Sequence, residues 1–411
     1  MSVLKKTQPM STGEPARALW ISTLAFTICF AVWTIFAIIG IRIKQELGLS
    51  ETQFGLLVGT PVLTGSLVRI LLGIWTERYG GRLVYTLTML AAAVATFLLS
   101  YATTYPQMLI AGLGVGLAGG SFAVGVAYIS PFFPAQKQGT ALGIFGAGNV
   151  GAAVTKFAAP FVLLAWGWQA VAEIWALVLA AMALVFWFST SDDPAFRARR
   201  NRGVARKSLL QEFAPLKNVQ VWRFSLYYFF AFGGFVALSL WLPRYLVGVY
   251  GFNLETAGMV AAAYSIPGSI FRAFGGFVSD KKGARSVMYA TLAVSAVATL
   301  ILSFAVTPAA FIVVVFVLGF FMSLGKAAVY KHIPVYYPES VGAVGGVVGM
   351  MGGLGGFILP IAFGALKDMT GLWSSCFLLL FVVVSIAFVW MHLSVKQLER
   401  RGLSSQAVAA S

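Results

Sequence analysis

The sequence has few charged residues, and acidic ones are the rarest among them. Of 411 residues, 10% are charged, with 13 Asp and Glu against 29 Lys and Arg. An ordinary soluble domain carries about 25% charged residues, so the composition excludes a typical soluble enzyme. Two histidines and two cysteines are too few for a metal-ligand cluster or a disulfide framework. Nucleotide-binding loops and nucleophile–base arrangements are also missing. We therefore expect no catalytic residues, no metal, no cofactor and no enzymatic activity.

Long apolar runs fill the chain instead, because 59% of the residues are hydrophobic. A membrane-spanning helix needs about 20 mostly apolar residues. Twelve such stretches follow one another, over 18–41, 54–75, 83–101, 106–129, 140–165, 169–189, 222–243, 256–278, 286–306, 308–330, 343–366 and 372–394. The first is too long for a signal peptide and lacks a clear cleavage site, so we expect it to be retained. The sequence predicts an all-α, multi-pass membrane protein surrounded by the lipid bilayer.

The surplus of basic residues predicts the orientation. A net charge of +16 would indicate nucleic acid in a soluble protein. With twelve spans, however, both termini share one side, and 20 of the 29 Lys and Arg lie on that side, against 4 on the other. Cytoplasmic loops carry such an excess, so we expect both termini in the cytoplasm and no nucleic-acid partner. The remaining five basic residues lie inside spans or at a span end: Arg69, Lys156, Arg272, Lys326 and Lys331.

The longest polar stretch, 190–221, separates six spans from six. We interpret it as a solvated cytoplasmic linker, with a short surface helix near 208–213. The predicted organisation is a cytoplasmic tail over 1–17, an N-terminal half over 18–189, this linker, a C-terminal half over 222–394 and a cytoplasmic tail over 395–411.

One ten-residue motif occurs in both halves. Residues 73–82 and 276–285 read G-x-x-x-[DE]-x-x-G-x-R, with matched positions 203 residues apart. A carboxylate at a helix end can pair with a helix N-terminus or an arginine and release it when the halves rock. The pattern resembles the loop 2–3 motif of the major facilitator superfamily and its copy at loop 8–9. That resemblance implies two pseudo-two-fold-related six-helix halves around a mid-membrane site. It also implies gating by Gly73, Glu77, Arg82, Gly276, Asp280 and Arg285.

Two arginines, Arg69 and Arg272, lie inside spans and are again 203 residues apart. A buried arginine normally has a partner. The only acidic residue inside the predicted spans is Glu173, near the far end of the sixth. We therefore expect an external anion to neutralise the pair. A planar guanidinium matches a planar oxyanion, which leaves nitrate, nitrite, bicarbonate and a carboxylate open.

Glycine strings in the fifth and eleventh spans narrow the resemblance. Residues 146–151 read G-x-G-N-x-G, and residues 349–360 read G-x-x-G-G-x-G-G-F-x-x-P. With the arginine pair, they resemble the signatures of the nitrate/nitrite porter family. The resemblance implies transport of nitrate, and of nitrite, by alternating access, and we expect a monomer. It implies substrate contacts from Arg69, Arg272, Asn149, Tyr228, Phe232 and Phe122, with Gly148, Gly352 and Gly353 shaping a small site.

Lys156, Lys326 and Lys331 are candidates for an anion path or for coupling. Lys331 can reach water with its long stem, whereas the other two lie deeper. Proton-driven carriers commonly use intramembrane Asp, Glu or His, and their scarcity here favours nitrate/nitrite exchange. The string Lys331-His-Ile-Pro334, with a central lysine in the tenth span, instead resembles the nitrate–proton symporter branch. We expect nitrate uptake coupled to protons, with exchange as the alternative and another small organic anion as a further one.

Overall fold

A computed structural model describes residues 13–200, 217–337 and 341–400. Within these ranges the chain forms helices and no strands. The helices are α1 (Glu14–Trp33), α2 (Phe36–Leu47), α3 (Glu51–Tyr79), α4 (Gly81–Leu99), α5 (Tyr105–Val115), α6 (Leu117–Ile129), α7 (Ala135–Gly146), α8 (Gly151–Ser189), α9 (Pro194–Arg200), α11 (Val219–Tyr228), α12 (Phe235–Tyr250), α13 (Leu254–Lys282), α14 (Ala284–Leu302), α15 (Pro308–Tyr336), α16 (Val341–Thr370) and α17 (Ser375–Arg400). Short irregular helices are η1 (Ser130–Phe132), η2 (Ala147–Val150) and η4 (Phe229–Gly234).

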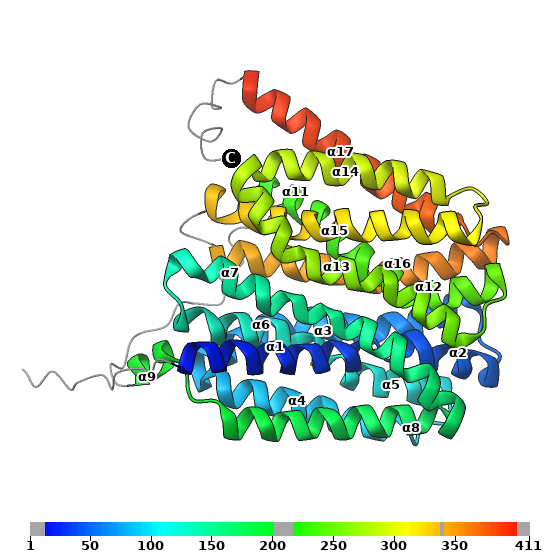
Figure 1. The fold of residues 1–411 in the computed structure, drawn as a ribbon, viewed down its shortest axis with the longest axis horizontal. Coiled ribbons are helices and arrows are strands. Elements are labelled where there is room, and N and C mark those ends of the chain that lie inside the picture. The colour runs from blue at the N-terminus through cyan, green and yellow to red at the C-terminus, as the bar shows by residue number, and fades with distance from the viewer. Residues whose placement is uncertain (1–12, 201–216, 338–340, 401–411) are drawn as a thin grey trace, which may run out of the picture.

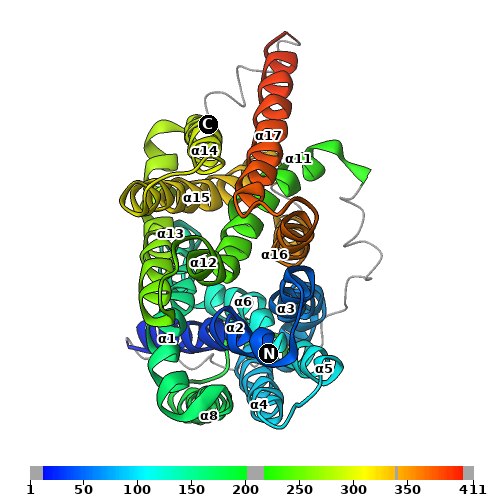
Figure 2. The same cartoon turned by 90° about the vertical axis from the view of Figure 1, so that its right-hand side faces the viewer.

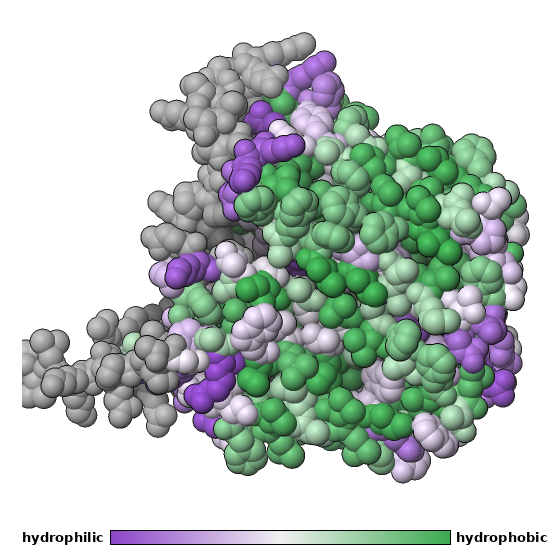
Figure 3. Space-filling view, viewed as in Figure 1, coloured by the Kyte–Doolittle hydropathy of each residue, from purple (hydrophilic) through white to green (hydrophobic). Residues whose placement is uncertain are grey.

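The long helices have the length and composition of membrane spans. Ten helical segments of the described chain meet both criteria. The longest, Thr140–Ser189, contains two spans, because Gly167 with φ 86° breaks α8. The 29-residue α13 is less apolar because it carries Arg272 and buried serines. Counting both spans of the longest segment and α13 gives the twelve predicted spans. Apolar side chains cover the middle of the bundle, and polar ones gather at its two ends (Figure 3).

An internal repeat underlies the fold. Helices α3 and α13 each have 29 residues and begin 203 residues apart; α4 and α14 each have 19 and are offset by the same distance. Ser50 and Asn253, also 203 apart, cap the first pair with their side chains. Gly80 and Gly283 take positive φ values of 91° and 81° between the paired helices, a conformation that favours glycine. The predicted two-half architecture is confirmed.

The two halves lie one above the other in Figures 1 and 2, with α1–α8 below and α11–α17 above. Helix α1 begins and α17 ends at the same end of the bundle, which we call the terminal face (Figure 1, left). The opposite end is the distal face, which points to the viewer in Figure 2. Helices α3 and α16 meet across the halves, as do α8 and α13.

The halves are in contact at the distal face and separate toward the terminal face. A methyl group added at Gly55, Gly258 or Gly364 would overlap a backbone carbonyl of the opposite half. Eighteen residues away on the same three helices, a methyl at Gly73, Gly276 or Gly346 would meet no atom within 4 Å. Eighteen residues are five helical turns, so each pair shares one helix face. The same faces are therefore packed at one end and free at the other.

Several helices extend beyond the predicted spans. Glu14 begins α1, Glu51 begins α3, and Asp368 lies in the last turn of α16. The full helices therefore contain acidic residues besides Glu173, which is the only one inside the predicted spans. The polar caps of these helices, such as the Ser50 capping box, extend them past their apolar segments. The added carboxylates lie at helix ends. The linker begins with α9, whereas the helix predicted near 208–213 lies outside the described residues.

Candidate functional site

The two arginines meet at one aromatic ring in the middle of the bundle. The Arg69 Cζ, from α3, lies 5.8 Å from the ring centroid of Phe122 on α6, and the Arg272 Cζ, from α13, lies 5.4 Å from it. Both arginines are buried, with 8% and 9% of their surface exposed. Two arginines that are 203 residues apart in the repeat thus meet at this ring from opposite halves. We call Arg69, Arg272 and Phe122, with the aromatic rings around them, the arginine layer.

The protein supplies little to neutralise these two cations. Arg69 Nη1 donates a hydrogen bond of 3.2 Å to the carbonyl oxygen of Gly349 on α16, and its Nε has no partner. Among the described residues, Arg272 has neither a hydrogen-bond acceptor nor a carboxylate partner. Aromatic rings surround both groups: those of Phe232 and Trp33 lie 5.5 and 5.9 Å from the Arg69 Cζ. A ring attracts a guanidinium but carries no compensating charge, so N–H donors remain for an anion.

Asn149 adds a buried amide beside Arg272. It lies in the 3₁₀ segment η2, is 1% exposed, and its Nδ2 has no partner. A methyl group at Gly146 would lie 3.4 Å from the Arg272 Cδ. Gly146 directly precedes η2, and η2 packs against α13, so Asn149 lies close to the helix that carries Arg272. A buried donor without an acceptor is costly, which makes the amide a candidate ligand contact.

The predicted aromatic residues gather in the same layer. Tyr228 and Phe232 stack with ring centroids 5.2 Å apart, at the π-helical turn η4, where the helix widens locally. Phe122 stacks on Phe145 at 5.7 Å. Tyr330 was missed by sequence reasoning, although its ring lies 5.8 Å from the Arg272 Cζ and 5.0 Å from Tyr228. Its position one turn after Lys326 on α15 was the available signal.

The three predicted glycines allow close packing around this layer. An added methyl would overlap the Phe26 ring at Gly148, the Tyr228 ring at Gly352, and the Ser66 side chain at Gly353. Larger residues at these positions would push helices or rings apart. The glycines thus allow the surrounding side chains to pack closely around the arginine layer. This role does not require the glycines themselves to contact a ligand.

The three predicted lysines lie in different surroundings. Lys156 and Lys326 are fully buried, and neither has a carboxylate partner among the described residues. Lys156 donates to the hydroxyls of Ser239 and Ser265, at 2.5 and 2.7 Å. Lys326 donates to the carbonyl oxygen of Gly268, and its Nζ lies 3.5 Å from the Phe235 ring centroid. Lys331 instead pairs with Asp280 of the duplicated motif, near the terminal face.

The duplicated motif makes different contacts in its two copies. Arg82 donates to the carbonyl oxygen of Trp187 at 3.0 and 2.5 Å and lies 4.2 Å above its ring. Asp280 pairs with Lys331 on α15, and Arg285 is half-buried in the first turn of α14. The Glu77 side chain lies outside the described part of the structure. Both motif copies therefore hold helices of their own half in this state.

A charged cluster at the distal face was not predicted from the sequence. Arg244 on α12 pairs with Glu51 on α3 at 2.5 Å, and Lys44 approaches the same carboxylate at 3.4 Å. The carboxylate of Asp368 on α16 accepts hydrogen bonds from the backbone N–H groups of Glu51 and Thr52, at 3.1 and 2.8 Å. The contacts of Arg244 and Asp368 join opposite halves, and the cluster stabilises the closed distal face.

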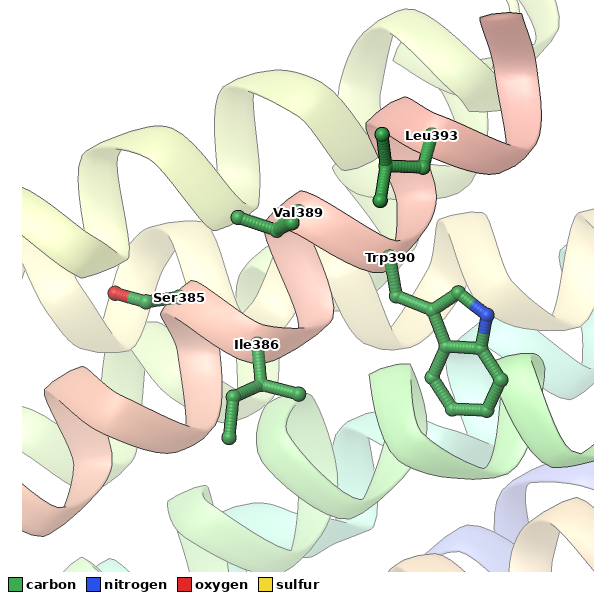
Figure 4. Close-up of a pocket in the computed structure, with 5 residues that line it drawn as sticks. All are labelled: Ser385, Ile386, Val389, Trp390 and Leu393. Carbon is green, nitrogen blue, oxygen red and sulfur yellow. The ribbon is translucent and has the colours of Figure 1, made fainter. Parts of the chain in front are cut away.

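A shallow hollow on α17 is a poor candidate for the site. Ser385, Ile386, Val389, Trp390 and Leu393 line it, on the outer face of the helix (Figure 4). Ile386, Val389 and Leu393 are about half exposed and apolar, as expected for side chains that face lipid. The hollow lacks charged groups, whereas the arginine layer holds two.

Comparisons with known proteins agree with this architecture. The family model described as the Major Facilitator Superfamily matches residues 21–261 and 250–408. The "Probable nitrate/nitrite antiporter NarK1" of Thermus thermophilus is 42% identical, over 96% of this chain and 94% of its own. The "Nitrite extrusion protein" of Bacillus subtilis (strain 168) is 30% identical, over 95% and 98%. The "Probable nitrate transporter NarT" of Staphylococcus carnosus (strain TM300) is 32% identical, over 94% and 98%.

A solved structure supports the fold alone. It is a bacterial homologue of the human lysosomal transporter Spinster, in an inward-facing and unoccupied conformation. The TM-score is 0.74 at 18% sequence identity, covering 94% of this chain and 98% of that one. The matched family, the relatives and the two-half architecture agree: the chain belongs to the Major Facilitator Superfamily and, within it, to the nitrate/nitrite porter family.

Proposed function

We propose that the protein carries nitrate, and nitrite, across a bacterial inner membrane by alternating access. The observation that carries this proposal is the meeting of two buried arginines from opposite halves, with no carboxylate beside them in the described chain. Two buried guanidiniums need a negative partner. A ligand that contacts both halves also binds differently as the halves move, which transport requires.

The chemistry of the layer fits a small planar anion. Arginine donates in a flat fork, which matches the plane of nitrate. Arg69 Nε and Asn149 Nδ2 are free to donate, and Arg272 has all its donors available among the described contacts. Aromatic rings surround these donors and suit a weakly hydrated anion. We assign substrate contacts to Arg69, Arg272, Asn149, Phe122, Tyr228 and Phe232.

The helices that carry the glycines are packed together at the distal face and free of contact at the terminal face. This difference supports an inward-facing conformation. With both termini in the cytoplasm, the terminal face is cytoplasmic and the distal face is periplasmic. The closed distal cluster of Glu51, Arg244 and Asp368 is then the outer gate. We assign the stretches 1–17, 190–221 and 395–411 to the cytoplasm and the six-helix halves to 18–189 and 222–394. A single copy of the chain contains the whole arginine layer, so we propose a functional monomer.

For coupling, we propose proton symport with Lys326 as the proton-carrying group. Lys326 is fully buried, and Gly268, whose carbonyl oxygen it contacts, lies one turn before Arg272 on α13. An anion held by Arg272 would stabilise an ammonium at Lys326, because opposite charges attract strongly in a low-dielectric interior. Anion and proton would then cross the membrane together.

Nitrate/nitrite exchange is the second candidate, and a separate observation favours it. Arg272 lacks any protein acceptor in the described chain, so the empty site would move two unpaired cations through the membrane interior. A carrier of this kind would change sides only when loaded. The relative named as an antiporter in Thermus thermophilus is consistent with exchange.

Counterflow in proteoliposomes tests the substrate. Vesicles loaded with unlabelled nitrate should accumulate labelled nitrate transiently, and external nitrite should compete with it. Formate, a small carboxylate, should compete weakly, and tetrahedral sulfate should not compete. Uptake in which formate or a larger organic anion competes better than nitrite would reject the nitrate assignment in favour of an organic-anion carrier.

A further inference from the structure

Lys156 and Ser265 form a second polar layer on the distal side of the arginine layer. Lys156 follows Asn149 by seven residues, and Ser265 precedes Arg272 by seven residues on α13. Seven residues are two helical turns, about 10 Å, and return to nearly the same helix face. The two layers therefore lie one behind the other along the interface between the halves.

The contacts of Lys156 cross that interface. Its Nζ donates to Ser239 Oγ on α12 at 2.5 Å, to Ser265 Oγ on α13 at 2.7 Å, and to the carbonyl oxygen of Ala152 at 3.2 Å. The two hydroxyls belong to the C-terminal half and bond to each other at 3.0 Å. Lys156 belongs to the N-terminal half and is 0% exposed. Among the described residues, the hydrogen-bond acceptors of the amine are all uncharged oxygens in this closed state.

Joining the halves does not by itself require a lysine. A buried amine with neutral acceptors is costly compared with an apolar contact of the same shape. Close backbone packing already holds the same two helices together, since Gly258 on α13 lies against the carbonyl oxygen of Lys156. The amine is therefore better explained by a state in which these helices have parted.

Opening of the distal face must separate α8 from α12 and α13. Lys156 then leaves both serine hydroxyls, and its amine faces the opened interface without them. Described carboxylates of the distal cluster, such as Glu51, pair with Arg244 and Lys44 rather than with this group. An ammonium freed from its neutral acceptors is a suitable binding group for a small anion.

We infer that Lys156, once parted from Ser239 and Ser265, is a second anion site in the distal-open state, which receives a small monovalent oxyanion before it reaches the arginine layer. This inference rests on the proposed nitrate transport. The anion moves about two helical turns inward to Arg272 and Asn149. When the distal face closes, the serine hydroxyls replace the anion at Lys156, so the amine keeps oxygen partners in both states.

Sided transport measurements test this site. Initial rates of nitrate counterflow are measured in right-side-out and inside-out membrane vesicles. We expect Lys156→Gln to raise the KM for nitrate entering from the distal face about tenfold, which corresponds to about 1.4 kcal/mol. The KM from the terminal face should stay within about twofold, because no anion enters past Lys156 from that side. We expect the same two KM values for Lys156→Met. This variant replaces Lys156→Gln if the glutamine variant does not reach the membrane.

The double variant Ser239→Ala/Ser265→Ala is the matched control. It keeps the amine but removes the hydroxyls that hold the closed state, so the distal-open population rises. The distal KM should then stay equal or fall, because more carriers are ready to bind from that side. The lysine and serine variants thus move the distal KM in different directions if Lys156 binds the anion.

A purely structural role gives a different result. If Lys156 only joins the halves, its neutral variants should lower the distal KM as the serine variant does. An unchanged or lowered distal KM in Lys156→Gln, with normal wild-type transport, overturns this inference alone. Wild-type vesicles that take up no nitrate from either face overturn the proposed function and this inference together.

Discussion

Arg69 and Arg272 occupy equivalent positions in the repeat but differ in their partners. Arg69 donates to the carbonyl oxygen of Gly349 across the halves at 3.2 Å, whereas Arg272 has no acceptor among the described residues. The repeat therefore brings two cations to one ring, Phe122, and leaves one of them wholly dependent on a ligand. Because of this asymmetry, we expect substitutions of Arg272 to change anion binding more than substitutions of Arg69.

Removing the Arg272 charge should stabilise the unliganded protein. A buried ion without a counterion carries a desolvation penalty of several kcal/mol, and a neutral group at the same position does not. We expect Arg272→Gln to raise the melting temperature without nitrate and to abolish the stabilisation that nitrate gives the wild type. In wild type, nitrate at about 100 times its Kd should add about 2.7 kcal/mol. Thermal melts with and without nitrate measure both effects; equal nitrate stabilisation in the two proteins would contradict the assignment of Arg272.

Asn149 should contribute to anion affinity but little to stability. Its Nδ2 has no protein partner, so Asn149→Ala breaks no hydrogen bond of the unliganded protein through that group. Loss of one donor to a charged ligand costs about 1.5–3 kcal/mol, which predicts a nitrate KM raised by about 10- to 150-fold. Thr155→Ala is the matched control in the same span. It loses bonds to Ala31 and Trp175, so its stability should fall while its nitrate KM stays near that of wild type.

Asp368→Asn should open the distal face more often. The carboxylate caps the N-terminus of α3 from the opposite half, and such a contact is worth about 0.3–1 kcal/mol, up to about 2 when partly buried. Spin labels at Gln45→Cys and Met369→Cys, both exposed, can report the separation of the halves, since Cys29 and Cys376 are buried. We expect the fraction of molecules with a long distance between the two labels to grow several-fold.

The control for this distance measurement is Glu46→Gln. Glu46 pairs with Arg42 and accepts from Trp168, all within the N-terminal half. Its removal should leave the distance distribution unchanged. A distribution that Asp368→Asn does not alter would show that the carboxylate is no part of the outer gate.

Lys326→Gln should separate transport from proton coupling. If Lys326 carries the proton, the variant loses uptake driven by an inward proton gradient but keeps nitrate counterflow. The measurement compares both assays in the same proteoliposomes, with and without internal nitrite. Wild-type uptake that requires internal nitrite and ignores the proton gradient would instead establish exchange.

Local patterns were sufficient to predict the helices and the arginine pair. Apolar runs of span length and the 203-residue repeat depend on spacing along the chain, and both are visible in the sequence. The helix ends were less predictable, because caps such as Ser50 extend α3 past its apolar segment and bring Glu51 into it. Likewise α13 is weakly apolar because one of its faces carries Ser265 and Arg272.

Contacts between the halves could not be predicted from the sequence. Asp368 and Thr52 are 316 residues apart, and Lys156 meets Ser239 and Ser265 from a different half. No local periodicity encodes which helix faces meet after the halves assemble. The sequence therefore predicted cations in the membrane interior, but not the serine hydroxyls or the distal cluster that accompany them.

Equilibrium binding of nitrate to the purified protein tests the central claim most directly. Titration calorimetry on wild type should show nitrate binding to the arginine layer, with Arg69→Lys and Arg272→Lys each weakening that affinity about 10- to 150-fold, since each loses charge-assisted hydrogen bonds worth about 1.5–3 kcal/mol. Lysine keeps the charge but not the planar fork. Lysine variants that bind nitrate as tightly as wild type would contradict the claim that the anion lies between these two guanidiniums.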